Sequence, residues 1–307
     1  MVLTPPNSEL VSIGKTLCVI LHYGSEEDTN RCLASLQSEN DLDIIISDND
    51  PMQSYSPSYE YANFVKVIKT GGQAGFSEGN NIAVNAFLND THDSVFILNN
   101  DTIVQAGAIR LLKQCLRSEG VGAVGPCMPF ADLPEKVWAC GGYINRKSLA
   151  IGGLQPKSNK QYEVDYLPGA AILTRSDLWK KIGGLSEKYF LAYEEAEFAL
   201  EVKRLGYKIM AEPNSIILHK VGMSSQSRPQ YFYNSIRNRI IFSKYLYGNS
   251  IGVIYGTLMT LRSLRSRQFF LIARCFRLWF EAVFDEFLDN PLNKQRLREI
   301  ELRYKNK

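Results

Sequence analysis

The chain has 307 residues, enough for one large domain or for a domain with an appendage. A formal net charge of only +3 carries no general nucleic-acid signature, and we expect no nucleic-acid partner. The start of the chain lacks the pattern of a signal peptide, and no uncharged apolar run reaches about 18 residues, so we expect no transmembrane helix. The six cysteines are scattered, without close pairs at metal-ligand spacing, which favours reduced core thiols in a cytosolic protein.

Strands and helices alternate from residue 17 to residue 124. The apolar runs and helical spacings predict strands at 17–21, 44–46, 65–68, 95–98 and 121–124, and helices at 28–36, 75–88 and 106–116. This alternation predicts a mostly parallel α/β sheet flanked by helices. Polar or glycine residues follow the strands, at His22-Tyr23, Asp48-Asn49, Gly71-Gly72 and Asn99 to Asp101. Ligands of open α/β sheets bind at the carboxyl ends of the strands, so we expect the site there.

The second half of the chain is less regular. At 129–160 we expect a long excursion or hairpin over the site, because long ordered loops in compact domains are usually functional. The elements predicted after it are a strand at 169–174, a helix at 177–182, a helix from Glu194 to Leu205 ended by Gly206, strands at 207–210 and 215–218, and a helix at 229–247.

Asp101 ends an abruptly polar stretch directly after an apolar strand. A carboxylate held at a strand end can bind Mg²⁺, which takes oxygen ligands and bridges to substrate phosphates. The alternative is that Asn99, Asn100 and Asp101 simply cap the next helix. His219 also follows an apolar strand, and a lone histidine is more often structural than a ligand. If its strand runs beside that of Asp101, the two side chains could share a metal.

Residues 71–81 form a glycine-rich stretch between a strand and a helix, which matches neither a Walker loop nor a dinucleotide fingerprint. Glycines such as Gly75 allow close backbone approach, and a helix start favours an anion. Asn80 and Asn81 are poor helix formers, so we expect them to make side-chain hydrogen bonds. A plain glycine turn is the alternative. The apolar face predicted for the helix consists of Phe76, Ile82, Ala83, Ala86 and Phe87.

Three glutamates open the helix that begins near residue 194. Glu195 lies three residues before Phe198 and shares its side of the helix, which is the predicted buried side. We therefore expect Glu195 to point inward, where a general base could sit. For Glu194 and Glu197 the alternative is that acidic residues favour helix N-termini.

Residues 251–280 combine apolar, aromatic and arginine side chains with no acidic residue. This is the composition of an interfacial helix, so we expect contact with a membrane surface. The alternative is a helix pair packed on the domain. We divide the chain into a catalytic domain at 1–245 and a C-terminal amphipathic helical extension at 246–307.

Eight of these stretches, in this order, resemble the family-2 glycosyltransferases, and within them the rhamnosyltransferase-like branch that builds bacterial O-antigen and related polysaccharides. They are His22-Tyr23, Asp48-Asn49, Gly75 to Asn81, Phe96 to Thr102, Gly169-Ala170, Tyr193 to Glu197, Pro213 to Ser224 and Arg237-Asn238. The resemblance covers roughly residues 15 to 245. Any one motif is weak, but eight in register are specific.

The resemblance implies a GT-A fold and an inverting transfer from a nucleotide sugar. It implies that Asp101 binds the divalent metal, Mg²⁺ or Mn²⁺, and that Asp48 binds the nucleoside. Glu195 stands at the position of the catalytic base. The remaining site residues that we expect are donor contacts at His22, Gly75, Asn80, Asn81, Asn99 and Asn100, a second metal ligand at His219, and acceptor or diphosphate contacts at Glu194, Arg237 and Arg239.

Some positions depart from the family pattern. The base is Glu195 where the family has Asp, which adds one methylene of reach, and a displacement of about 1 Å can cost around 100-fold in rate. Glu197 also replaces an Asp, Glu201 or Lys203 stands where an Arg is usual, and Gln73-Ala74 replaces the commoner Asn-containing lead-in.

Two functions follow from the resemblance. The first is transfer of rhamnose or another hexose, from a donor such as dTDP-rhamnose, to a lipid-linked oligosaccharide at the inner face of the plasma membrane. The second is a weak or silent nucleotide-sugar-binding homologue that acts as a scaffold in polysaccharide assembly. A nicotinamide dehydrogenase is excluded because no dinucleotide fingerprint follows any predicted strand.

Overall fold

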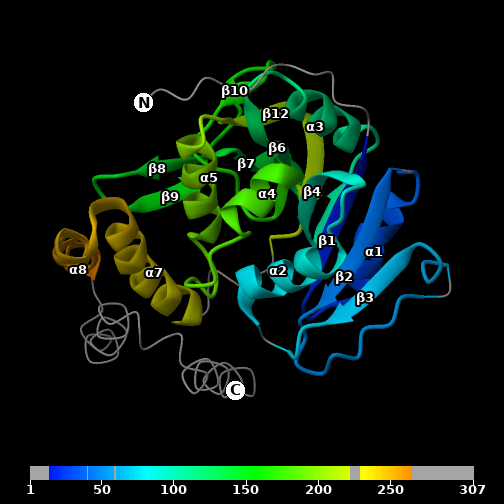
Figure 1. Ribbon diagram of the computed structural model, residues 1–307, viewed down its shortest axis with the longest axis horizontal. Helices are drawn as coiled ribbons and strands as arrows, with labels where there is room; N and C mark the ends of the chain where they lie inside the picture. The colour runs from blue at the N-terminus through cyan, green and yellow to red at the C-terminus, as the bar shows by residue number, and fades with distance from the viewer. Residues whose placement is uncertain (1–13, 40, 59, 73, 222–228, 265–307) are drawn as a thin grey trace. The chain divides into compact units, whose positions relative to one another are not determined.

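The computed structural model describes residues 14–39, 41–58, 60–72, 74–221 and 229–264 (Figure 1). Contacts divide the chain into two compact units, which we describe separately. The first unit consists of residues 1–144, 151–187 and 194–222, and the second of 145–150, 188–193 and 223–307. The predicted functional boundary after residue 245 stays a prediction.

A ten-stranded mixed sheet forms the centre of the first unit. Its strands are β1 (Lys15–His22), β2 (Leu42–Asp48), β3 (Val65–Lys69), β4 (His92–Asn99), β5 (Thr102–Val104), β6 (Val121–Phe130), β7 (Leu133–Cys140), β10 (Tyr162–Glu163), β11 (Ala171–Arg175) and β12 (Lys208–His219). The main order is β10-β12-β6-β11-β4-β1-β2-β3. β3, β2, β1 and β4 run parallel, whereas β11 is antiparallel to both of its neighbours, β4 and β6.

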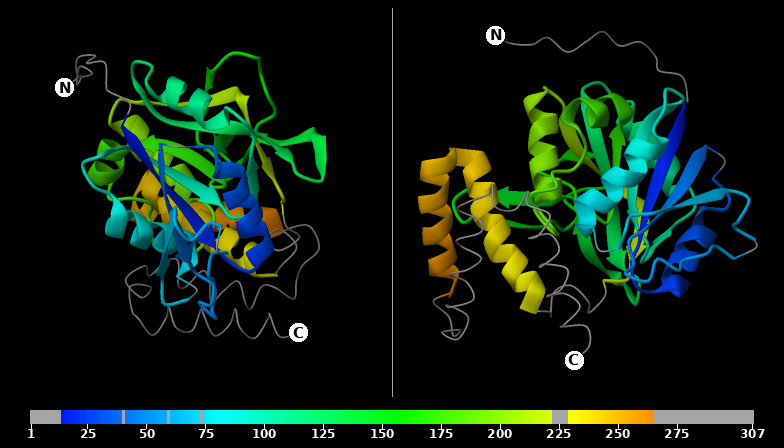
Figure 2. Two further views of the ribbon diagram at one scale, coloured as in Figure 1. Left: turned by 90° about the vertical axis from the view of Figure 1, so that its right-hand side faces the viewer. Right: turned by 60° about the horizontal axis from the view of Figure 1, so that its bottom comes forward.

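Helices lie on both faces of this sheet, as the alternating pattern predicts (Figure 2). They are α1 (Glu26–Leu36), α2 (Gly75–Phe87), α3 (Ala108–Leu116), α4 (Ser176–Ile182) and α5 (Glu194–Arg204). Side chains of successive strand residues point to opposite faces. Cys18 and Ile20 of β1 therefore belong to the main core with residues of α1 and α3, whereas Leu21 meets α2 at Gly79.

The buried face of α2 differs from the prediction. Phe76 and Ala83 are buried, but Ala86 is exposed, and the polar residues Ser77, Asn80 and Asn81 are buried instead. The apolar spacing could not predict this burial, because Asn80 bonds the carbonyl of Phe76 within the helix and Asn81 bonds Leu185, which is distant in the sequence.

The predicted excursion at 129–160 consists largely of strands. β6 turns into β7, and β8 (Gly142–Asn145) pairs with β9 (Ala150–Gly153) in a separate two-stranded sheet. The two strands predicted at 207–210 and 215–218 are one strand, β12, with a shift of register against β6 between Glu212 and Ile216. Pro213 lies in this irregular part, where a residue without an N–H is tolerated.

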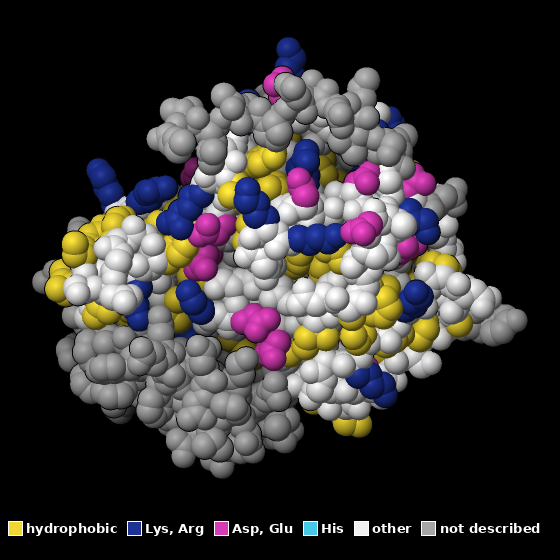
Figure 3. Space-filling model, in the orientation of Figure 1, with side chains coloured by type: hydrophobic (Ala, Val, Ile, Leu, Met, Phe, Trp, Pro, Cys, Tyr) yellow, Lys and Arg dark blue, Asp and Glu magenta, His cyan; other side chains and the backbone are white. Residues whose placement is uncertain are grey.

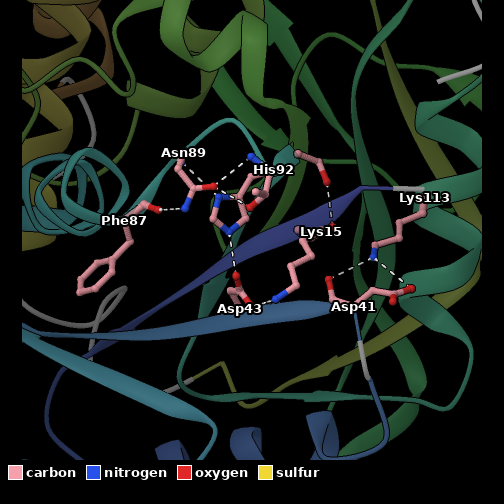
Figure 4. Close-up of polar contacts among 10 residues, drawn as sticks. Lys15, Asp41, Asp43, Phe87, Asn89, His92 and Lys113 are labelled. Atoms are coloured by element: carbon pink, nitrogen blue, oxygen red, sulfur yellow. Dashed lines mark hydrogen bonds and ion pairs between the residues drawn. The ribbon is translucent and has the colours of Figure 1, made fainter. Parts of the chain in front are cut away.

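Polar side chains connect the amino ends of β1, β2 and β4, at the opposite ends of the strands from the predicted site (Figure 4). Asp43 accepts hydrogen bonds from Lys15 at 2.9 Å and from Nε2 of the buried His92 at 3.1 Å. The N–H of Asn89 donates to Nδ1 of His92 at 3.2 Å. Burial alone would raise the pKa of Asp43, but the hydrogen bonds from Lys15 and His92 outweigh it and lower this pKa.

The second unit contains α7 (Pro229–Tyr247) and α8 (Asn249–Leu264). Hydroxyl groups of Tyr247 and Tyr255 donate to the carbonyl oxygens of Arg146 and Lys147, at 2.8 and 2.6 Å. Within the part of the chain that the structure describes, none of the helices has the length and apolarity needed to cross a bilayer. On the face seen in Figure 3, acidic and basic side chains of the described residues are interspersed.

Candidate active site

Three parallel strands bring their polar ends to one edge of the sheet. His22 at the end of β1 pairs with Asp48 at the end of β2, and Leu21 pairs with Asn99 at the end of β4. The predicted gathering of these residues at the carboxyl edge of the sheet is confirmed.

Asp101 and His219 lie together beside this edge. β12 runs antiparallel to β5, so that His219 is opposite Thr102, and its Nε2 is 3.2 Å from Oδ1 of Asp101. The N–H of Lys220 also donates to the carbonyl oxygen of Asp101 at 2.9 Å. The expectation that the strand of His219 runs beside Asp101 is therefore confirmed. Trp138, which the sequence did not single out, packs edge-on against the His219 ring with centroids 4.5 Å apart.

The donor set at Asp101 suits a divalent metal that is shared with a phosphate. Among the described residues, no group of three or more His, Cys, Asp or Glu side chains could hold a metal ion by itself. Mg²⁺ is usually bound by one or two carboxylates together with substrate phosphates and water, so a complete protein cage is not required. The Asp101 side chain is 25% exposed, which leaves it accessible, whereas that of His219 is only 8% exposed.

A hydroxyl group links two predicted donor contacts to each other. Oγ1 of Thr29 lies 2.7 Å from Nδ1 of His22 and accepts a hydrogen bond from Nδ2 of Asn100 at 2.9 Å. Burial lowers the pKa of His22, although the nearby Asp48 opposes this shift. The imidazole packs against the ring of Tyr55 with centroids 4.5 Å apart.

The Asp48 side chain is fully buried and orders the loop that follows β2. Its Oδ1 accepts from the N–H of Asp50 and its Oδ2 from the N–H of Tyr55, both at 3.2 Å. The next residue, Asn49, was not among the predicted site residues. Its Oδ1 accepts from the Thr70 hydroxyl and from the N–H of Ala74, both at 2.7 Å, and so fixes the glycine-rich loop to β2.

The amides on α2 make hydrogen bonds, as predicted, to backbone groups of the protein and, from Asn81, to the Glu187 carboxylate at 3.0 Å. Nδ2 of Asn81 donates to the carbonyl of Leu185 at 2.8 Å, and Oδ1 accepts from the N–H of Leu185 at 3.0 Å. Nδ2 of Asn80 donates to the carbonyl of Phe76 in its own helix at 2.9 Å. Gly75 has a φ of +76°, a conformation that favours glycine.

The glutamates at the start of α5 are oriented differently from the prediction. Glu194 and Glu197 are only 2% and 8% exposed, whereas Glu195 is partly exposed. The prediction that Glu195 alone points inward is therefore wrong. Positions 194, 197 and 198 share one helix face, and helical spacing alone could not decide which carboxylates that face would contain. The Glu195 side chain as a whole is partly exposed, but its Oε2 is buried.

Two residues before α5 have an unusual backbone conformation. Ala192 and Tyr193 have φ values of +72° and +81°, which is strained for residues other than glycine. Within the second unit, Nδ2 of Asn238 donates to the carbonyl oxygens of Leu191 and Ala192, both at 2.8 Å. Asn238 is therefore a positioning residue for the segment that directly precedes Glu194.

The two arginines that we predicted to contact an acceptor or a diphosphate belong to the second unit. Arg237 of α7 is buried and donates from Nη1 to Oδ1 of Asn238 at 3.0 Å. The contacts predicted for Arg237 and Arg239 with an acceptor or a diphosphate stay predictions.

A cavity of about 350 Å³ lies in the first unit between α2, α5 and the loop after α4. Its lining includes Asn81, Gly184, Glu187, Glu197 and Glu201, so several of its polar groups can accept hydrogen bonds from hydroxyl groups.

The mixed sheet with its polar carboxyl edge defines a GT-A glycosyltransferase fold. The family model described as "Glycosyltransferase like family 2" matches residues 58–240, more than half of the chain. The chain belongs to glycosyltransferase family 2.

Curated relatives include two glycosyltransferases. The chain is 23% identical over 252 residues to the low-salt glycan biosynthesis hexosyltransferase Agl10 of Haloferax volcanii, covering 79% of this chain and 80% of that protein. It is 22% identical over 240 residues to an N-acetylglucosaminyl-diphospho-decaprenol L-rhamnosyltransferase of Mycobacterium tuberculosis, covering 69% and 78%.

Two solved structures share the fold. GalNAc-T7 with UDP, GalNAc and Mn²⁺ matches with a TM-score of 0.61 and 13% identity over 77% of this chain, which spans about half (51%) of that structure. The mannosyltransferase PcManGT from Pyrobaculum calidifontis, in complex with GDP-Man and Mn²⁺, matches with a TM-score of 0.53 and 10% identity, covering 92% of this chain and 84% of that one.

Proposed function

We propose that this protein is an inverting, metal-dependent hexosyltransferase that transfers rhamnose or another hexose from a nucleotide-diphosphate donor. The Asp101–His219 pair, 3.2 Å apart beside the carboxyl edge of the sheet, is the observation that supports it most strongly. The rhamnosyltransferase relative, whose name specifies a decaprenol-diphosphate-linked sugar, supports a lipid-linked oligosaccharide acceptor in surface polysaccharide synthesis, such as that of O-antigen.

Asp101 would hold the divalent metal, Mg²⁺ or Mn²⁺, with His219 as a second ligand. When bound, such a metal neutralises the negative charge of the leaving diphosphate. The polar ends of β1, β2 and β4 would surround the nucleotide, with Asp48, Asn99 and Asn100 shaping the loops that contact it. Asn80 and Asn81 would act indirectly, because their amides hold backbone groups.

Glu195 would take the proton from the acceptor hydroxyl as that oxygen attacks the anomeric carbon. Attack opposite the leaving diphosphate inverts the anomeric centre. Glu194 and the polar cavity beside α5 would contact the acceptor saccharide.

Three side chains of α8 support the proposed contact with the inner face of the plasma membrane. Ile251, Ile254 and Leu258 are 66%, 64% and 54% exposed, and their spacing places them on one side of the helix. Residues 265–280 of the predicted membrane-binding segment lie outside the described residues.

The first experiment measures thermal stabilisation by nucleotides and nucleotide sugars, with and without Mg²⁺ or Mn²⁺. A ligand that binds only the folded state raises the midpoint of unfolding. We expect a metal-dependent rise with dTDP or UDP species, and we expect Asp101→Ala to abolish it.

Asp90→Ala is the matched control, because Asp90 is a fully exposed carboxylate outside the site. A folded wild-type protein that responds to no nucleotide would overturn the assignment of the donor site.

The scaffold alternative is favoured by the replacement of the family's Asp by Glu195. The two functions differ in the behaviour of Glu195→Gln. We expect this variant to bind nucleotide as the wild type does and to lose at least about 100-fold in sugar transfer, a loss within the range that a positioned base contributes. Wild-type protein that binds nucleotide and transfers no sugar would support the scaffold.

A further inference from the structure

Two free, buried thiols face each other next to the metal-binding region. Cys127 of β6 and Cys140 of β7 are directly opposed in the antiparallel ladder, and their side chains are joined by a hydrogen bond. The sequence suggested scattered thiols without close pairs, and only the pairing of the strands brings these two together.

The backbone hydrogen bonds of Cys140 show that it and Cys127 form a non-hydrogen-bonded pair in the ladder. Its N–H donates to the carbonyl of Leu154 at 2.7 Å, and its carbonyl accepts from the hydroxyl of Tyr162 at 2.9 Å. Both groups therefore point away from β6. Opposed residues that exchange no backbone hydrogen bonds have Cα atoms about 4.5 Å apart. That separation lies within the range of about 4.4–6.8 Å found in disulfides.

We propose that Cys127 and Cys140 form a reversible disulfide when the protein meets a small peroxide. Cys140 releases its proton, its thiolate attacks one peroxide oxygen, and the O–O bond breaks to give a sulfenic acid and hydroxide. The hydroxide takes up the released proton and becomes the first water. The Cys127 sulfur then attacks the Cys140 sulfur, the S–O bond breaks, and the released oxygen leaves as water with the proton of Cys127. In total, two thiols and one hydrogen peroxide give one disulfide and two waters.

The environment of the pair favours Cys140 as the attacking sulfur. The hydrogen bond from the Cys127 thiol lowers the pKa of Cys140, while the same hydrogen bond, together with burial, raises the pKa of Cys127. The thiolate is the reactive form of cysteine. Among the described strands β7 pairs only with β6, and residues 133–136 of β7 are exposed, so local opening of this hairpin admits a small oxidant.

The disulfide would also affect the proposed metal site. Trp138 lies two residues before Cys140, and its ring contacts His219, which in turn contacts Asp101. β6 and β7 change register beside Trp138, between Met128 and Pro129, so this part of the ladder can adjust. A disulfide would fix β6 and β7 to each other two residues from Trp138, and so change how that ring can adjust against His219. This consequence rests on the proposed function, whereas formation of the disulfide does not.

The test is treatment of the purified full-length protein with hydrogen peroxide, followed by alkylation of the remaining thiols and mass spectrometry of unreduced peptides. We expect one cross-link between Cys127 and Cys140, which thiol reductants reverse. It should be absent in Cys127→Ala and Cys140→Ala and present in Cys115→Ala, a matched control at a buried thiol in α3. No 127–140 cross-link, or peroxide oxidation of Cys140 to sulfinic acid alone, would overturn the proposal.

Metal-dependent thermal stabilisation by nucleotides then separates the two proposals. If the oxidised protein responds less than the reduced protein, the effect on His219 is supported. An equal response in both states overturns that effect and leaves the disulfide. A cross-link in a protein that responds to no nucleotide in either state supports the disulfide while the proposed function fails.

Discussion

Buried polar side chains at the carboxyl edge of the sheet mostly bind other parts of the protein. Thr29 connects His22 and Asn100, Asn49 holds the loop before α2, and Asn81 holds Leu185. A buried polar group that loses its partner costs about 1–3 kcal/mol. These contacts therefore stabilise the loops at this edge of the sheet.

Replacing Thr29 by valine tests this bridge between His22 and Asn100. The change keeps the shape of the side chain and removes the hydroxyl, leaving two buried groups without their partner. We expect the free energy of unfolding to fall by about 1–3 kcal/mol, measured by urea denaturation. Thr29→Ser keeps the hydroxyl and should lose less. Equal losses in the two variants would mean that packing, rather than the hydrogen bonds, determines the effect.

Individual helices and strands fix the positions of polar side chains that their sequence pattern alone does not specify. α5 buries Glu194 and Glu197 and leaves Glu195 partly exposed, and the end of β12 pairs with β5. At the opposite ends of the strands, Asp43 connects β1, β2 and β4 through Lys15 and His92. These contacts hold in register the strands that carry the site residues at their other ends.

The Asp43 contacts predict a dependence of stability on pH. The pKa of Asp43 is lower in the folded protein, so its contribution to stability is present above its unfolded pKa of about 3.9 and is lost as the pH falls through the folded value. Denaturation of wild type and Asp43→Asn between pH 7 and pH 3 should show a difference in unfolding free energy that shrinks with acidification. A difference that stays constant over this range would contradict the prediction. The effect should also weaken in high salt, because Asp43 is 39% exposed.

At the scale of the whole molecule, the chain combines a sheet-based unit with a helical unit. The first unit contains Asp101, His219 and Glu195, and the second contains Arg237, Asn238 and α8. If the acceptor is linked to a lipid, the second unit supplies the apolar surface that a membrane interface requires.

Replacing Ile254 by aspartate tests this membrane contact. Ile254 is exposed, so folding should be unaffected, while a charge on the apolar side of α8 should weaken binding to the interface. We expect several-fold less protein to sediment with anionic lipid vesicles. Asn249→Asp adds the same charge at an exposed position on the opposite side of α8 and serves as the control. Equal loss in both variants would indicate an effect of charge alone.

The sequence by itself determined the alternating elements, the fold class and the gathering of His22, Asp48, Asn99 and Asp101 at one edge of the sheet. Local periodicity and the polar residues at strand ends are sufficient for this, because the carboxyl ends of parallel strands meet at the same edge. Only the tertiary structure decided that β11 runs antiparallel within the sheet, that Asn81 binds Leu185, and that Cys127 faces Cys140. These contacts join residues far apart in the chain, and their partners depend on strand register and helix rotation, which no local pattern specifies.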